Sequence, residues 1–115
     1  MIHRPKFTLE FAPETVDHLD AIERKYHRLI QKTIDEQLGF APDQETRNRK
    51  PLERPTSFGF AQDKPFGATW ELRFGANNRF RVFYEVDSME QSVQVLAIGE
   101  KEGSRLFIGG KEVQI

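Results

Sequence analysis

The sequence contains no cysteine, and this absence excludes two classes of protein. Without thiols the chain forms neither a disulfide-stapled scaffold nor a thiolate metal site, and it fits a reducing compartment. No window approaches the eighteen consecutive apolar residues that a membrane span needs, and the opening residues MIHRPKF lack the apolar run of a signal peptide. We therefore expect a cytoplasmic protein with no membrane partner.

Familiar catalytic motifs are also missing. There is no phosphate-binding glycine loop and no serine or cysteine nucleophile motif. The three histidines, His3, His18 and His27, lie in the N-terminal part of the chain, and no pair has a metal-ligand spacing with a carboxylate. We interpret them as exposed residues of the N-terminal strand and helix region. The sequence thus predicts neither a metal site nor a cofactor.

The net charge is small, but the charges are strongly segregated along the chain. The 115 residues carry a formal net charge of −1 and have the length of a single domain, 1–115. Residues 46–81 nevertheless carry eight basic and three acidic side chains, whereas the segments on either side each have a net charge of −3. This pattern predicts a local basic surface, which is what phosphate binding requires.

The N-terminal third has the pattern of a strand followed by one helix. Residues 6–11 alternate, with Phe7, Leu9 and Phe11 on one face. Beyond Pro13, apolar residues recur every three or four positions, which predicts a single amphipathic helix that ends at Gly39. The stripe consists of Val16, Leu19, Ile22, Tyr26, Leu29, Ile30, Ile34 and Leu38.

Residues 70–86, WELRFGANNRFRVFYEV, predict a β-hairpin whose apolar sides lie on one face. Matching those sides pairs Phe74 with Phe80, Leu72 with Val82 and Trp70 with Tyr84. Residues 76–78 then form the loop, in which an asparagine can adopt the one left-handed conformation that is needed.

The same register places Arg73 directly opposite Arg81, with Arg79 on the same face. Like charges in opposed positions destabilise a sheet by roughly 0.2–1 kcal/mol, so an anion would relieve them. Alternatively, Glu71 and Glu85 on that face neutralise the arginines as a solvated ion-pair ladder. The residues alone leave both interpretations open.

The remaining segments complete the predicted domain. Residues 46–55 form a basic loop, and residues 56–67, in which SFGFA is followed by PFGAT, resemble an inserted loop whose phenylalanines enter the core or stack on bases. Residues 92–99 are apolar on both faces, with Val93, Val95 and Ala97 on one and Leu96 and Ile98 on the other, which predicts a central strand. A charged turn at 100–103, a short extended piece and a glycine break precede the tail. We predict an α+β fold with a mainly antiparallel sheet of about four strands packed against the helix.

In this order of elements the chain resembles the RelE/ParE superfamily of toxins from bacterial type II toxin–antitoxin systems. The segments that carry the resemblance are KPLERP, WELRFG, NNRFRVFYEV and VLAIGEKEGSRLF. The resemblance implies a RelE-like fold and a cognate antitoxin as partner. RelE-like members cleave messenger RNA on the ribosome, whereas ParE-like members inhibit DNA gyrase.

By this resemblance, the chain is expected to be a metal-independent endoribonuclease in which a 2′-hydroxyl attacks the neighbouring phosphorus. Arg81 and Arg73 match basic residues of the family's sheet face, and Lys101 matches a basic residue after the Ile-Gly strand end. Such chemistry needs cations at the phosphorus, a base and an acid. We assign Arg73 and Arg81 as the cations, Glu71 as a base and Lys101 as an acid or base. The expected RNA-binding residues are Arg79, Arg47, Arg49, Lys50 and Arg54.

Several departures from the family pattern favour the alternatives. Glu71 stands where some relatives have a lysine, and Phe107 where several have an acid-donating tyrosine. A single long helix replaces the family's helical hairpin, and the insertion at 56–67 lies beside the expected active face. A gyrase-inhibiting toxin and an inactive member that only binds antitoxin therefore remain alternatives.

Overall fold

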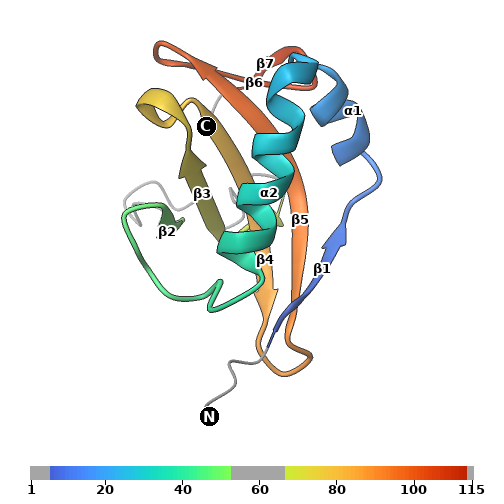
Figure 1. Ribbon diagram of the computed structural model, residues 1–115, viewed down its shortest axis with the longest axis vertical. Coiled ribbons are helices and arrows are strands. Elements are labelled where there is room, and N and C mark those ends of the chain that lie inside the picture. Colours follow the sequence, from blue (N-terminus) through green and yellow to red (C-terminus); the bar gives the residue numbers. More distant parts are fainter. Residues whose placement is uncertain (1–5, 53–66, 114–115) are drawn as a thin grey trace.

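Seven strands form one sheet in the computed structural model, which describes residues 6–52 and 67–113 (Figure 1). The elements are β1 (Thr8–Phe11), α1 (Thr15–Asp20), η1 (Arg24–Tyr26), α2 (His27–Leu38), β2 (Arg49–Pro51), β3 (Trp70–Phe74), η4 (Ala76–Asn78), β4 (Phe80–Asp87), β5 (Ser92–Glu102), β6 (Arg105–Ile108) and β7 (Lys111–Val113). The predicted α+β class is confirmed, with more strands than the sequence indicates. Apart from Gly67, the predicted insertion lies outside the described residues.

β5 is the central strand of the sheet. The order is β2-β3-β4-β5-β6-β7 with antiparallel neighbours throughout, and β1 is the one parallel addition among the described strands. β1 pairs with the first part of β5, as in Leu9 opposite Val93, and β6 pairs with its last part, as in Leu106 opposite Lys101. The predicted central strand is confirmed. The sequence predicts a turn at 100–103, but β5 continues to Glu102, so this prediction is wrong for residues 100–102. The tail after the glycine break contains the strand β7.

The predicted single helix is wrong, because the chain bends between α1 and α2. At Glu23 the backbone is extended, with φ −52° and ψ 136°, although no glycine or proline announces a break. The bend lets Ile22 before it and Ile30 after it bury against the same core, and it leaves Val16 and Leu29 exposed. Tertiary packing thus overrides a continuous apolar stripe, and two α-helices stand where the sequence predicts one.

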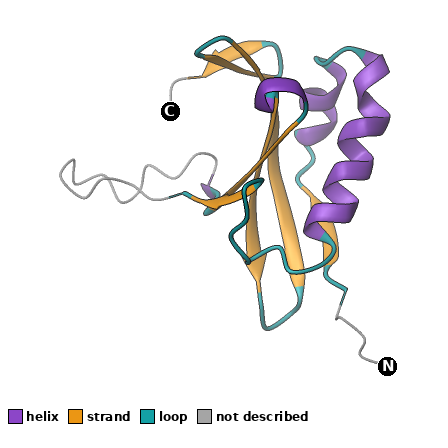
Figure 2. Ribbon diagram, turned by 60° about the vertical axis from the view of Figure 1, so that its left-hand side comes forward, coloured by secondary structure: helices purple, strands orange, loops and turns teal. Residues whose placement is uncertain are grey.

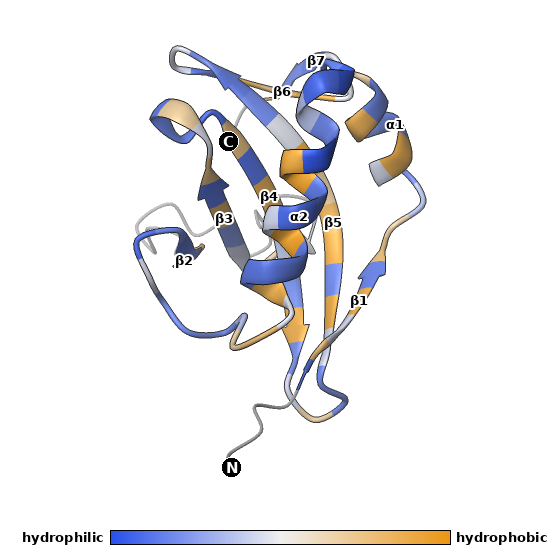
Figure 3. Cartoon of the chain, viewed as in Figure 1, coloured by the Kyte–Doolittle hydropathy of each residue, from blue (hydrophilic) through white to orange (hydrophobic). Residues whose placement is uncertain are grey.

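Both helices cover one face of the sheet, here called the helix face (Figure 2). Ile30, Ile34 and Leu38 of α2 are buried in the core against the strands. Apolar bands recur between hydrophilic ones along this helix (Figure 3). The buried residues of this core are Phe7, Ile22, Ile30, Ile34, Leu38, Leu72, Phe74, Phe80, Val82, Tyr84, Val93, Val95 and Ile98. The Tyr84 hydroxyl donates to the Pro42 carbonyl at 2.7 Å, and burial raises the pKa of Tyr84, so the hydroxyl remains a donor.

A smaller core lies on the opposite face, here called the far face. Its buried residues are Ala68, Phe83, Ala97, Leu106 and Ile108. β6 passes very close to β5 at Gly99, where a Cβ would lie 2.8 Å from Ile108 Cγ1 and 2.9 Å from the Phe107 carbonyl oxygen. The absence of a side chain at Gly99 therefore permits this approach, which is the structural use of glycine within a strand.

One extra residue in β5 changes which side chains share a face. Phe83 pairs with Ala97 but Tyr84 pairs with Val95, so Leu96 is a β-bulge. The predicted grouping of Ala97 with Val95 is therefore wrong: Val95 and Ile98 belong to the helix-face core, and Ala97 belongs to the far-face core. Beyond the bulge, alternation places Lys101 on the far face, opposite Leu106 of that smaller core.

Candidate functional site

The β3–β4 hairpin sets the geometry of the candidate site. Its register is as predicted, including Arg73 opposite Arg81. The turn differs from the prediction of one left-handed residue, because Asn77 and Asn78 have φ of 56° and 53° and Gly75 has φ of 83°. Asparagine and glycine tolerate this conformation best, so the local sequence suits the turn that aligns the two arginines.

A buried carboxylate joins the two opposed arginines. Glu71 is 4% exposed; its Oε1 accepts a hydrogen bond from Arg73 Nε at 2.7 Å and its Oε2 accepts one from Arg81 Nη1 at 3.0 Å. Neutralisation by an ion pair is thus confirmed for Glu71, whereas Glu85 is exposed. Two guanidinium groups share one carboxylate, so this cluster keeps an excess positive charge.

Arg81 is held more tightly than Arg73. Its side chain is 12% exposed, against 38% for Arg73, and its Nε donates to the Asn78 carbonyl at 3.1 Å. A carboxylate and a turn carbonyl therefore fix the Arg81 guanidinium from two sides. A cation fixed in this way needs little rearrangement to meet a bound anion.

Two cavities meet at Arg81 and Lys101. The larger, about 510 Å³, is lined by Ala76, Asn77, Arg79, Arg81, Lys101, Glu102 and Gly103. The smaller, about 210 Å³, is lined by Arg81, Lys101, Ser104, Arg105, Leu106, Glu112 and Val113. Lys101 forms no ion pair with any residue in 6–52 or 67–113, whereas Arg81 is bound to Glu71. The structure thus brings together four predicted residues, Arg73, Arg81, Glu71 and Lys101, at one place on the far face.

The predicted position of Arg79 on the far face is wrong for its guanidinium, which turns toward the helix side, although the residue also lines the larger cavity with Arg81 and Lys101. Its guanidinium binds the Glu100 carboxylate, donates to the Tyr26 hydroxyl at 3.0 Å and lies 4.6 Å from the centre of the Tyr26 ring. The hydrogen bond to Glu100 raises the pKa of Arg79. The reason is local: β4 begins at Phe80, so Arg79 belongs to the turn and is outside the strand alternation.

The basic residues of the predicted loop at 46–55 differ in their contacts. Arg49 in β2 donates to Gln44 and Gln37 through its guanidinium, which attaches this edge strand to the end of α2. Lys50 lies opposite Glu71 and forms an exposed ion pair with Glu45 at 3.8 Å. Arg47 is exposed, and Arg54 lies outside the described residues.

His18 and His27 have structural partners, which corrects the interpretation of these two histidines as exposed residues. His18 is half-buried and its Nδ1 accepts a hydrogen bond from the Ile98 amide at 3.3 Å; burial lowers the pKa of His18. The Nε2 of His27 lies 2.7 Å from the Ile22 carbonyl. His3 is not among the described residues. Within the described part of the chain, no three His, Cys, Asp or Glu side chains cluster as metal ligands.

Sequence reasoning missed the partners that hold the site. Glu100 and Tyr26 fix Arg79, and Ser104 and Glu112 line the smaller cavity. The hairpin register offers a signal for Glu100, which lies opposite Phe80 next to Arg79. No local signal identifies Tyr26, because its approach depends on the bend between the two helices.

The sequence matches no protein-family model, and no curated protein matches it. Solved structures do match. A chain of the toxin–antitoxin complex RelBE2 from Mycobacterium tuberculosis is 19% identical with a TM-score of 0.63, covering 84% of this chain and 92% of that chain. A chain of the archaeal RelE–RelB complex from Pyrococcus horikoshii OT3 is 17% identical with a TM-score of 0.59, covering 86% of this chain and 98% of that chain.

The fold and the site together define a small α+β protein with helices on one face of its sheet and a cationic cluster on the other. The structural likeness then makes the fold specific: it is the RelE-like fold that the sequence predicts. Among the described residues, no helix combines the length and the apolar character needed to cross a membrane.

Proposed function

We propose that this protein is the toxin of a toxin–antitoxin pair and acts as a ribosome-dependent messenger RNA endonuclease in the cytoplasm. The observation that carries the proposal is the far-face cluster, in which Arg81 is fixed by Glu71 and stands with Lys101 between two cavities. The RelE-like fold supports the same class, because the two structural neighbours are chains of toxin–antitoxin complexes.

The proposed reaction is attack of a ribose 2′-oxygen on the adjacent phosphorus. The new O–P bond forms as the bond to the 5′-oxygen breaks, the 2′-hydroxyl loses its proton and the leaving oxygen gains one. Arg81 and Arg73 stabilise the negative charge that builds up on the phosphoryl oxygens, since guanidinium groups bind such oxygens through two donors. The reaction needs no metal ion.

We propose different roles for the two remaining residues of the cluster, Glu71 and Lys101. Both Glu71 oxygens already accept hydrogen bonds from arginines, so we propose that Glu71 positions these cations in addition to its predicted role as base. Lys101 makes no ion pair with a described residue, and we propose it as the group that protonates the leaving oxygen. Arg47, Lys50 and Arg54 remain proposed RNA contacts, with Arg79 and Arg49 contributing less because protein partners hold their guanidinium groups.

The test is cleavage of a defined message on purified ribosomes, mapped by primer extension. We expect Arg81→Ala to lower the cleavage rate by about 100-fold or more, the loss typical of removing one transition-state donor. Lys101→Met tests the proton transfer without disturbing Glu71. Arg24→Ala is the matched control, because Arg24 is an exposed arginine in η1. Cleavage by folded Arg81→Ala at the wild-type rate would contradict the arginine-centred mechanism.

A second candidate function, inhibition of DNA gyrase, is supported by Phe107, because this residue has no hydroxyl to serve as the acid of RNA cleavage. This residue lies in β6 with the Arg105 guanidinium 5.6 Å from its ring centre. If the wild-type protein is folded and leaves ribosome-bound message intact, inhibition of DNA gyrase becomes the preferred proposal. A supercoiling assay with purified gyrase decides it, since a dose-dependent loss of supercoiling is the expected sign; without that loss, an inactive antitoxin-binding member is preferred.

A cognate antitoxin is the proposed protein partner in every version. The excess positive charge around Glu71 suits an acidic segment laid over the far face. We expect the association rate to fall as the salt concentration rises, because screening weakens attraction between exposed charges. Stopped-flow measurements at low and high salt test this, and equal rates would argue against an electrostatic interface.

A further inference from the structure

We propose that Arg79 is a positioning residue that holds Lys101 beside Arg81, and that Tyr26 connects this arrangement to the helices. The proposal rests on the proposed function, in which Lys101 protonates the leaving oxygen of RNA cleavage. In this role Arg79 acts through Lys101, whereas the sequence predicts a direct contact between Arg79 and RNA.

The main chain of Arg79 supports the end of β5. The pairing of β5 with β4 ends with Phe80 opposite Glu100, so Lys101 lies one residue beyond it. There the Lys101 amide donates a hydrogen bond to the Arg79 carbonyl at 2.7 Å. This bond links Lys101 to the hairpin that carries Arg81.

The side chain of Arg79 restrains the same strand from the helix side. Its guanidinium binds the carboxylate of Glu100, the residue that precedes Lys101 in β5. Because consecutive residues of a strand point to opposite faces, Glu100 is held on the helix side while Lys101 points to the far face. Arg79 therefore restrains this end of β5 by a main-chain hydrogen bond and by an ion pair.

Tyr26 holds the Arg79 guanidinium from the side of the helices. Its hydroxyl accepts a hydrogen bond from Arg79 Nη1 at 3.0 Å, and its ring centre lies 4.6 Å from the guanidinium, a distance at which the ring attracts a cation. The same ring lies 5.2 Å from the ring of Phe80, the first residue of β4. Because Tyr26 belongs to η1 at the bend between α1 and α2, these contacts join the helices to the turn that carries Arg79.

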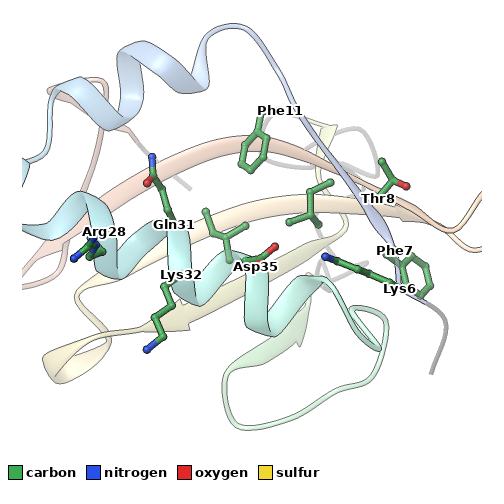
Figure 4. Close-up of a pocket in the computed structure, with 10 residues that line it drawn as sticks. Lys6, Phe7, Thr8, Phe11, Arg28, Gln31, Lys32 and Asp35 are labelled. Carbon is green, nitrogen blue, oxygen red and sulfur yellow. The ribbon is translucent and has the colours of Figure 1, made fainter. Parts of the chain in front are cut away.

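Arg79, Arg81 and Lys101 line the same cavity of about 510 Å³, and Tyr26 is not among its lining residues. We therefore expect Tyr26 to affect the proposed reaction through Arg79. Arg28 lies close to Tyr26 in the sequence but lines a different cavity, of about 820 Å³, between β1 and α2 (Figure 4). Arg28 is thus a matched control for Arg79.

The first test separates kcat from KM for cleavage on programmed ribosomes. We expect Arg79→Ala to lower kcat about tenfold and to leave KM unchanged, since a small displacement of a proton donor slows the chemical step without weakening binding. Arg28→Ala should change neither constant. A higher KM with unchanged kcat would indicate a direct RNA contact and would overturn the inference.

A double-mutant cycle tests whether Arg79 acts through Lys101. Arg79→Ala added to Lys101→Met should slow cleavage no further than Lys101→Met alone, because the group that Arg79 positions is already absent. Two losses that multiply would show that Arg79 acts independently of Lys101, and the inference would fail.

Two tyrosine variants separate positioning from stability. Tyr26→Phe removes the hydroxyl that meets Arg79 but keeps the ring, and we expect kcat to fall about threefold or more. Tyr84→Phe is the matched control, because it removes a buried hydroxyl that donates to the Pro42 carbonyl. It should lower stability and leave kcat unchanged. A folded Tyr26→Phe variant with the wild-type kcat would refute the connection to the helices.

Hydrogen exchange at the Lys101 amide tests the arrangement without any activity. In Arg79→Ala this amide should exchange about tenfold faster than in wild type, because the carbonyl that it bonds is no longer anchored. The Thr8 amide, which bonds the Gln91 carbonyl near the start of β5, should keep its rate. Faster exchange at Lys101 in a protein that leaves message intact would support the positioning and refute the nuclease proposal alone. An unchanged Lys101 rate would overturn the inference.

Discussion

The two faces of the sheet differ in what their side chains do: the helix face carries the large apolar core, and the far face carries the cationic cluster. Among the described residues, the core between the helix face and the helices contains thirteen buried side chains, some of them from α2 itself. The Arg79–Glu100 ion pair lies outside this core. The far face has five buried apolar residues and a buried carboxylate that holds two arginines. Alternation along each strand allows this division, because stability and charge are carried by different side chains of the same segment. The comparison shows that burial in the large core can offset the free energy that the buried charged cluster on the far face costs.

The largest expected effect distinguishes the two cores. We expect Ile34→Ala on the helix face to lower the free energy of unfolding by about 2–5 kcal/mol, as cavities in close-packed cores do. Ile34 is 1% exposed and lies in the larger cluster, whereas Ile108 is 6% exposed in the smaller one. Ile108→Ala should therefore cost less. Chemical denaturation measures both, and equal losses would contradict the ranking of the two faces.

The next effect concerns the buried carboxylate of the far face. Glu71→Gln should lower the free energy of unfolding by about 1–3 kcal/mol, because it leaves two guanidinium groups without their counter-charge. It should also slow the proposed RNA cleavage, because Arg81 loses the carboxylate that fixes it. Glu85→Gln is the matched control on the exposed end of β4, and we expect a change within about 0.5 kcal/mol. If the two variants unfold alike, Glu71 is no more than a surface group.

A third test examines the close contact between β5 and β6. Gly99→Ala should lower the free energy of unfolding by about 1–3 kcal/mol, because the added methyl would crowd Ile108 and the Phe107 carbonyl. Adding Ile108→Ala to this variant should not restore stability, since the backbone oxygen remains in place. Thermal melts of the single and double variants measure both effects. Full recovery in the double variant would show that only the Ile108 side chain obstructs.

The smallest expected effect is a pH dependence on the helix side. Burial lowers the pKa of His18 below its ordinary value of 6.5, so the unfolded chain binds more protons as the pH falls through that value. Folding stability should decline below about pH 6.5 and be fully present above it. Denaturation at pH 7.5 and 5.5 should show a smaller difference for His18→Gln than for wild type. Equal differences for the two proteins would contradict this prediction.

Local pattern predicted the strands better than the helices or the contacts at the ends of strands. The hairpin register follows from two-residue alternation alone, and it placed Arg73 opposite Arg81 correctly. The bend at Glu23 could not be predicted, because it depends on packing against a sheet that forms later in the sequence. Arg79 was misplaced for a related reason: simple alternation was extended one residue beyond the start of β4.

One part of the predicted site follows from the local sequence, and another part depends on contacts between distant segments. Arg81, Arg73 and Glu71 share one hairpin, so their proximity follows from its register. Lys101 joins them only because of the bulge at Leu96, which no residue pattern in β5 announces. Ser104 and Glu112 line the smaller cavity, and Glu112 lies there because β7 pairs with β6. The local sequence pattern does not predict this pairing.

The bulge at Leu96 has an evolutionary consequence. Deleting the Leu96 codon would remove the extra residue and restore unbroken alternation in β5, with Glu100 and Lys101 still on their present faces. If all the present residues instead alternated without a bulge, Glu100 would replace Lys101 beside Arg81, so an anion would replace a cation although every amino acid stayed the same. The number of residues in this strand, as well as their identity, therefore determines the charge of the cluster.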